Sequence, residues 1–182
     1  MAEFRLETER LILREGRKDE RPLFQALFNT PEMTRHMGGV ARAAEFNRLF
    51  DKRLSDQTQD GLSYWAVELR EEGIVVGSCG LRRARNYPGT PVQDMVEAGW
   101  RIAAPWWRKG LAEEAMRTAL AWGWRTLADP IIGGWTTGQN MPSLKLMRKL
   151  GFVRARQLDF DRPVSGERCL VHLLQRLGSA NL

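Results

Sequence analysis

The sequence contains only two cysteines and two histidines among its 182 residues; the two cysteines lie far apart along the chain, and so do the two histidines. Structural zinc sites use Cys and His ligands at short, repeated spacings, and redox sites use paired cysteines. Cys79, Cys169, His36 and His172 show neither pattern, so no metal site and no redox-active pair are predicted. Each cysteine is expected to be a small core residue.

Long apolar runs are also missing from the sequence. No segment approaches the roughly 18 consecutive apolar residues that a membrane-spanning helix needs. The first five residues include acidic and basic side chains, where a secretory signal peptide would have an apolar stretch. The sequence therefore predicts a cytoplasmic protein without a membrane-spanning segment.

Positive charge exceeds negative charge, with 28 Lys and Arg residues against 22 Asp and Glu residues and a net charge of +6. Such a balance suits nucleic acid, an acidic protein surface or a phosphorylated small molecule. The basic residues are spread along the chain without an aromatic–basic recognition motif, which disfavours nucleic acid. The length and an apolar fraction of 43% are those expected of one domain, residues 1–182, with a sizeable core.

Residues 95–103 read as an apolar strand, and a glycine turn and a helix rich in alanine and leucine follow it. Arg108, Lys109 and Gly110 stand at the start of that helix. Unpaired backbone N–H groups make a helix N-terminus a site for anions, and glycine lets an anion approach the backbone. Two cations there are unfavourable unless an anion binds, which favours a phosphate site. The alternative is that both cations are solvated surface residues.

Hydrophobic periodicity and turn residues predict a mixed α/β domain with an antiparallel first part and a βαβ unit in the middle. The expected strands cover residues 8–15, 64–69, 74–81, 95–103, 131–137, 152–160 and 168–175. The expected helices cover residues 19–28, 30–36, 43–56, 111–127 and 143–150. Thr30 is the expected cap of the second helix, with Pro31 at its first position.

The strand at residues 95–103 has two different faces. Val96, Ala98, Trp100 and Ile102 form an apolar face that is expected to lie in the core. The opposite face carries Glu97 beside a glycine, as a wall that lines a cavity would.

Four segments resemble the GCN5-related N-acetyltransferase (GNAT) superfamily, and within it the RimJ/RimL-type ribosomal-protein N-terminal acetyltransferases. They are TERLILR at residues 8–14, IVVGSCGL at 74–81, WRKGLAEEA at 107–115, and Asn140-x-x-Ser143 followed by KLGF at 149–152. Together they cover nearly the whole chain in the order and spacing of that subgroup. The resemblance implies a mostly antiparallel sheet of about seven strands flanked by helices.

The resemblance also implies acetyl-CoA as donor and a primary amine as acceptor. The backbone of Ile102 and Ala103 would then pair with the pantetheine amides. The pyrophosphate would lie in the loop at Trp107, Arg108, Lys109, Gly110, Leu111 and Ala112. The usual loop has glycine where Arg108 stands, so this side chain either folds outward or adds a phosphate contact. Asn140 would bind near the pantetheine arm, or it is simply a helix cap.

Catalysis of this kind needs a neutral amine, a stabilised oxyanion and a proton for the leaving thiolate. Glu97 is the candidate base, with Asp94 in reserve; the alternative is a surface carboxylate paired with Arg101. Many members of the superfamily have a tyrosine where this chain has Met147. The resemblance to the RimJ/RimL type makes Ser143 the candidate donor to the thiolate, and the alternative is capping of the helix start.

We therefore expect an N-acetyltransferase that transfers acetyl directly in a ternary complex. The acceptor is either a protein N-terminus or a small amine such as a polyamine, amino acid or antibiotic. Residues 19–56 and the loop at 86–91 are expected to form the acceptor groove. A noncatalytic acyl-CoA-binding regulatory domain is the alternative from another class. The sequence leaves the oligomeric state open, with a homodimer among the options.

Overall fold

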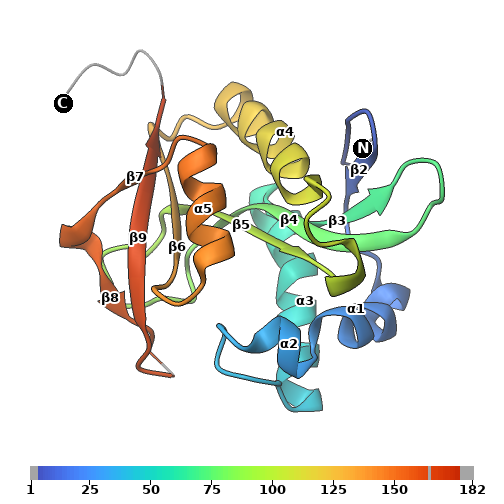
Figure 1. Ribbon diagram of the computed structural model, residues 1–182, viewed down its shortest axis with the longest axis horizontal. Helices are drawn as coiled ribbons and strands as arrows, with labels where there is room; N and C mark the ends of the chain where they lie inside the picture. Colours follow the sequence, from blue (N-terminus) through green and yellow to red (C-terminus); the bar gives the residue numbers. More distant parts are fainter. Residues whose placement is uncertain (1–3, 164, 177–182) are drawn as a thin grey trace.

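The computed structural model describes residues 4–163 and 165–176, and a twisted nine-stranded sheet forms its centre (Figure 1). The strand order is β1-β2-β3-β4-β5-β6-β9-β7, with β8 also paired to β9. The strands are β1 (Arg5–Glu7), β2 (Leu11–Arg14), β3 (Ser63–Leu69), β4 (Val75–Arg83), β5 (Val96–Ile102), β6 (Ile131–Thr137), β7 (Val153–Arg154), β8 (Phe160–Asp161) and β9 (Arg168–Gln175).

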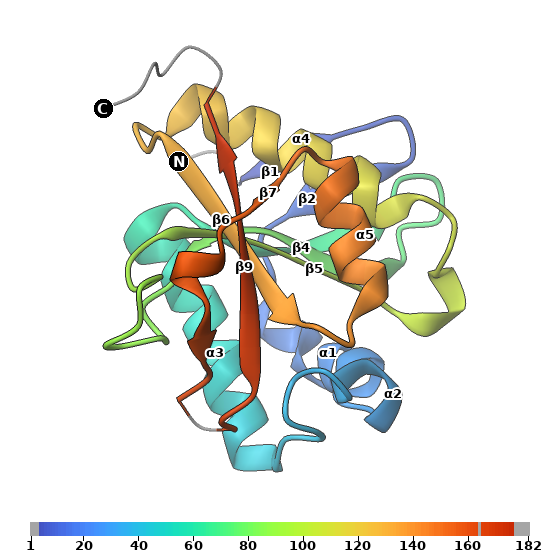
Figure 2. The same ribbon diagram turned by 60° about the vertical axis from the view of Figure 1, so that its left-hand side comes forward.

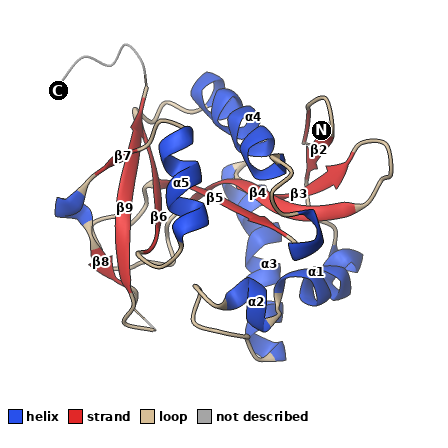
Figure 3. Ribbon diagram, viewed as in Figure 1, coloured by secondary structure: helices blue, strands red, loops and turns tan. Residues whose placement is uncertain are grey.

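Five α-helices cover this sheet in the described part of the chain (Figure 3). They are α1 (Arg21–Phe28), α2 (Pro31–Thr34), α3 (Ala43–Asp60), α4 (Leu111–Thr126) and α5 (Met141–Lys149), and the short 3-10 turns are η1 (Lys18–Glu20), η2 (Ala104–Trp106) and η3 (Arg156–Leu158). The mixed α/β architecture that the sequence predicts is thus confirmed. None of these helices is long and apolar enough to cross a membrane.

The expected number of about seven strands is wrong, because an unpredicted strand, β1, precedes the first predicted strand and another predicted strand is divided in two. The segment at residues 8–15 contains a turn, since the Thr8 hydroxyl accepts the N–H of Leu11 at 2.8 Å, and β1 pairs back onto β2. The segment at residues 152–160 is interrupted by η3, which separates β7 from β8. Local side-chain hydrogen bonds of this kind compete with strand pairing.

Helix boundaries follow the caps. The Thr30 hydroxyl accepts the N–H of Met33 at 3.3 Å and Pro31 begins α2, as predicted. Helix α3 runs four residues past the expected end, until Gly61 stops it in a left-handed conformation. Glycine at this position closes a helix without steric cost.

The sheet is covered on both sides. Helix α4 packs on one side through a buried apolar stripe: Leu111, Ala115, Met116, Ala119, Leu120 and Gly123. Gly123 is required there, because a Cβ atom on it would lie 2.5 Å from a methyl carbon of Leu81 in β4. Phenylalanines from α1 and α3 pack against the other side, around Ala66 and Val75.

One break in the regular pairing positions the functional site. Strands β5 and β6 are the only parallel pair in the described sheet, and they pair only at Val96–Ile132 and Glu97–Gly133. Beyond these residues the two strands diverge, and Figure 2 shows β6 running away from the direction of β5. The backbone of β5 past Glu97 therefore has an open edge on the β6 side.

Candidate active site

The loop of residues 107–112, called the anion loop below, joins β5 and η2 to helix α4. Arg108 and Gly110 both have positive φ angles, of 61° and 79°. The similar loops of the family to which this one was compared have glycine at position 108. The left-handed conformation explains that glycine, because it costs energy in a residue with a Cβ atom. No side chain caps α4, and its first intrahelical bond runs from the N–H of Glu114 to the oxygen of Gly110 at 3.1 Å. The N–H groups before Glu114 are therefore available to an anion.

The charged side chains around the anion loop leave its mouth positive. Glu113 pairs with Lys149 at 2.5 Å, and Glu114 pairs with Arg10 at 2.6 Å, so both carboxylates of the first turn are held to the side. Arg108 and Lys109 are exposed, and neither side chain has an ion-pair partner among the described residues. Both side chains are thus exposed, which is compatible with solvated surface residues, and the loop geometry also suits a phosphate.

Arg10 is a residue of this region that the sequence did not reveal. Its guanidinium donates to the oxygen of Lys109 at 3.1 Å and binds Glu114, so it fastens the start of β2 to the anion loop. The one signal in the sequence is its position in the opening TERL segment, which resembles the subgroup. The sequence alone does not show why that segment has an arginine there.

The open edge of β5 offers fewer free backbone groups than predicted. Ala103 donates its N–H to Val76 at 2.9 Å and accepts the N–H of Trp106 at 2.9 Å, so the expectation that Ala103 pairs with pantetheine is corrected. Hydrogen-bonded pairs alternate along antiparallel strands, so Ile102 and Trp100 direct their backbone groups toward the β6 side. The oxygen of Ile102 accepts the Trp107 indole N–H at 2.5 Å.

A cavity of about 150 Å³ lies where β5 and β6 separate, and it is called the β5 cavity below. Nine structural segments contribute to it, from the loop after α2 to the hairpin before β9. Its lining comprises His36, Met37, Arg53, Tyr64, Ser78, Arg82, Tyr87, Glu97, Ala98, Gly99, Trp100, Arg101, Trp135, Thr136, Asn140, Ser143, Met147 and Arg162. The two segments expected to form the acceptor groove both contribute, and the contributions of β6, α5 and Arg162 come in addition.

Glu97 lies on the cavity side of β5, as the alternation of that strand predicts. Its carboxylate is 6% exposed and accepts the Arg82 Nε–H at 2.7 Å. The alternative of a surface carboxylate paired with Arg101 is therefore wrong. Asp94, the reserve candidate, is exposed and lies outside the β5 cavity.

Tyr64 was missed as a site residue, although it enters the cavity from β3. Its ring lies over Gly99, where a Cβ atom would come within 2.3 Å of Tyr64 Cζ, and under the Arg82 guanidinium at 4.6 Å. Burial raises the pKa of Tyr64 well above its usual value, and the Glu97 carboxylate adds to this against the opposing effect of Arg82. The phenol therefore stays protonated at neutral pH. The only sequence signal for Tyr64 was Gly99, the glycine on the cavity face of β5 that the Tyr64 ring covers.

Asn140 and Ser143 line the same cavity as Glu97. The Asn140 side chain accepts the N–H of Ser143 at 3.4 Å and donates to the Thr136 hydroxyl at 2.9 Å, so its role as a helix cap is observed. The Ser143 hydroxyl has no hydrogen-bond partner among the described residues and is half-buried. Met147 is buried at the cavity wall, where it packs and cannot donate a proton.

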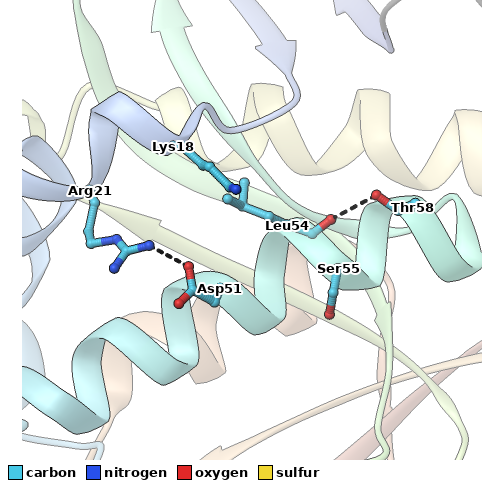
Figure 4. A pocket seen from close by; sticks show the side chains of 6 residues that line it. All are labelled: Lys18, Arg21, Asp51, Leu54, Ser55 and Thr58. Carbon is cyan, nitrogen blue, oxygen red and sulfur yellow. Dashed lines mark hydrogen bonds and ion pairs between the residues drawn. The ribbon is translucent and has the colours of Figure 1, made fainter.

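A second hollow lies on the surface between η1 and α3 and has about 460 Å³ (Figure 4). Its lining consists of Lys18, Arg21, Asp51, Leu54, Ser55 and Thr58. Arg21 and Asp51 pair across it at 2.5 Å, and most of the lining is exposed. None of the predicted site residues contributes to it, whereas Glu97, Asn140 and Ser143 line the smaller β5 cavity.

Both cysteines are buried, as expected of core residues. In the described ranges, no three His, Cys, Asp or Glu side chains are grouped closely enough to hold a metal ion.

Comparison with known proteins agrees with this geometry. Residues 10–153 match the family model described as acetyltransferase (GNAT) domain. The chain belongs to this family. It is 27% identical over 152 residues to the uncharacterized N-acetyltransferase YoaA of Bacillus subtilis, with 81% of each sequence covered.

Solved structures show the same fold. An acetyltransferase from Agrobacterium tumefaciens superposes with a TM-score of 0.82 at 22% identity, covering 97% of this chain and 96% of the other. A putative ribosomal-protein-serine acetyltransferase from Vibrio cholerae gives 0.74 at 19% identity, covering 95% and 98%. This GNAT acetyltransferase is therefore an acyltransferase by family, and its acceptor has to be inferred from its own residues.

Proposed function

We propose that this GNAT acetyltransferase transfers acetyl from acetyl-CoA to a primary amine, directly and in a ternary complex. The observation that carries the proposal is the convergence of the two candidate catalytic residues. Glu97 from β5 and Ser143 from α5 line one cavity at the open edge of β5. The anion loop follows that strand after only η2.

The described residues fit acetyl-CoA at both ends of the open edge. The N–H groups of residues 108–112 would hold the pyrophosphate, with Arg108 and Lys109 beside it. The backbone of Ile102 and Trp100 would pair with the pantetheine arm, as an added strand does. Trp107 supports this edge through its bond to Ile102, and Asn140 supports the start of α5. Acetyl-CoA supplies the acetyl thioester.

Glu97 would take the proton that the attacking amine loses. Arg82 holds one oxygen of its carboxylate and so fixes its orientation toward the cavity. The nitrogen first adds to the acetyl carbon, whose oxygen gains the negative charge, and the carbon–sulfur bond then breaks, so that coenzyme A leaves as the thiolate and takes up a proton. The Ser143 hydroxyl would donate a hydrogen bond to the departing sulfur, in a half-buried position where such a bond is stronger than in water.

A protein N-terminal α-amino group is one candidate acceptor, and the ribosomal-protein acetyltransferase from Vibrio cholerae is a structural neighbour consistent with it. Such an amine has a pKa of about 8, so a useful fraction is neutral at pH 7 without strong help. A small-molecule amine is the other candidate.

The test is thiol release from acetyl-CoA, with a panel of peptides and small amines and mass analysis of the product. We expect an acetylated nitrogen in at least one acceptor. Binding of acetyl-CoA with no product from any amine would contradict transfer and leave a noncatalytic acyl-CoA-binding domain.

A further inference from the structure

The charge of the β5 cavity is not balanced. Four arginines line it, against the single carboxylate of Glu97. Arg82 is paired with Glu97 at 2.7 Å, and Arg162 with Glu167 at 2.7 Å. Arg53 and Arg101 have no carboxylate within 4.0 Å among the described residues. The cavity therefore holds two guanidinium groups without a counter-ion.

Arg53 projects into the cavity from α3. Its guanidinium lies over the Phe24 ring at 5.1 Å, and its Nη1 atom is buried without a hydrogen-bond partner. Burial lowers the pKa of Arg53 to about 9, and the nearby Arg101 and Arg82 act in the same direction. The group remains charged at neutral pH, so its buried donor lacks both an acceptor and a counter-charge. A buried donor without a hydrogen bond destabilises the folded protein.

Arg101 approaches the same space from β5. Among the described residues its guanidinium has one weak polar partner, the Sδ atom of Met37, to which an N–H donates at 2.9 Å. The guanidinium lies 5.9 Å from the centre of the Phe28 ring. Burial lowers the pKa of Arg101 to about 10; Tyr64 opposes this effect, and Arg82 adds to it. A second buried donor without a partner, Trp135 Nε1, lines the same cavity. Cationic donors gather here, and Glu97 is the one carboxylate in the lining.

A carboxylate meets these requirements. Guanidinium groups bind carboxylates through paired N–H donors, and such bonds are about twice as strong as neutral ones. A carboxylate would also remove the repulsion between Arg53 and Arg101. A polyamine would bring further positive charge to the same space. A cavity of about 150 Å³ suits only a small group.

We propose that the acceptor of this acetyltransferase is an amine with a carboxylate a few bonds from its nitrogen, and that Arg53 and Arg101 hold that carboxylate. The inference rests on the proposed acetyl transfer. It narrows the acceptor to a free amino acid, or to a peptide whose first residue is acidic. Both present the same chemistry, with the amine directed toward Glu97.

The experiment compares matched acceptors at saturating acetyl-CoA. Each free L-amino acid of a panel is paired with its own amide, and the peptide Asp-Ala-amide is paired with Asn-Ala-amide. We expect kcat/KM to be about tenfold or more higher for the carboxylate member of at least one pair, a ratio typical of a charged hydrogen bond. The first set identifies a free amino acid, and the second identifies an acidic N-terminus.

Variants then assign the preference to the two arginines. Arg53→Met and Arg101→Met should raise KM for the carboxylate acceptor and reduce the preference to about one, with the amide substrates little changed. Arg101→Lys should restore part of the preference, because it returns the charge. Arg48→Met, an exposed arginine on the same helix as Arg53, is the control and should leave the preference intact.

The outcomes separate the two proposals. If no amine at all is acetylated, the proposed transfer fails. If amides and carboxylates are acetylated equally well, the inference of a carboxylate-bearing acceptor is overturned while the proposed transfer stands. If both methionine variants keep the preference, the assignment of the carboxylate to Arg53 and Arg101 is overturned. Thermal melting of each variant shows that it is folded, and both methionine variants are expected to melt at or above the wild-type temperature because repulsion is removed.

Discussion

In the anion loop the groups proposed to bind the cofactor are backbone N–H groups, whereas in the β5 cavity the groups proposed to act on the acceptor are side chains, and the cavity lining comes from nine segments. The loop needs only a left-handed turn at Arg108 and Gly110 and an uncapped helix start. The cavity needs Arg53, Tyr64 and Glu97, which come from a helix and two different strands. One region is built locally, and the other is built by the whole fold.

This difference divides the work between the two substrates. A backbone site tolerates side-chain change as long as the turn is kept, which suits a cofactor common to a family. A side-chain site changes with each substitution, which suits an acceptor that differs between members. Variants in the loop should therefore alter acetyl-CoA affinity, and variants in the cavity should alter acceptor use.

The largest effect is expected from Glu97→Gln. Loss of a general base typically lowers kcat by about 100-fold or more, and acetyl-CoA affinity should not change because the anion loop is intact. Steady-state turnover and calorimetry measure the two quantities. Glu68→Gln is the control: Glu68 also pairs with an arginine, Arg14 at 2.8 Å, outside the cavity. Equal losses of turnover in both variants would assign Glu97 a structural role.

Gly99→Ala is expected to follow, with a loss of roughly 30-fold in kcat/KM for the acceptor. The new Cβ atom would lie 2.3 Å from Tyr64 Cζ, so the ring must move within the cavity, and displacements of about 1 Å can cost up to about 100-fold. In the Tyr64→Ala background the same change should cost little, because the clash is gone. Additive effects of the two substitutions would contradict this contact.

Ser143→Ala should lower kcat about tenfold, the value of one hydrogen bond of ~1.4 kcal/mol. Its melting temperature should not change, because Asn140 caps the backbone N–H, which alanine keeps. Asn140→Ala should instead lower the unfolding free energy by ~1 kcal/mol through loss of the cap. If Ser143→Ala lowered stability and spared turnover, the hydroxyl would have no part in transfer.

The smallest effect is expected from Arg108→Gly. A left-handed residue with a Cβ atom costs ~1–2 kcal/mol, and the greater freedom of unfolded glycine offsets about 0.5–1 kcal/mol of the gain. Urea denaturation should therefore show a rise of ~0.5–1 kcal/mol. Arg108→Ala keeps the Cβ atom and should show no rise. An equal rise in unfolding free energy in both variants would mean that the guanidinium group, and not the backbone conformation, destabilises the wild-type protein.

The same contrast explains what could be predicted from the sequence. Periodicity places α4, and alternation places Glu97 on the cavity side of β5, because both patterns are local. The turn at Thr8 and the interruption by η3 depend on hydrogen bonds that periodicity does not record, so two strands were missed. Arg53 reads as an ordinary polar helix residue, and only the packing of α3 against β3 and β4 brings it near Arg101.

The most direct test is calorimetric titration of acetyl-CoA into the wild-type protein, Gly110→Glu and Gly73→Glu. Both glycines have positive φ angles, but Gly73 lies in the open turn before β4, so its variant controls for backbone strain. We expect micromolar-range binding by the wild type and Gly73→Glu, and a loss of about 100-fold or more in Gly110→Glu, where a carboxylate enters the anion loop. Undiminished binding by a folded Gly110→Glu protein would contradict the assignment of the loop to the cofactor.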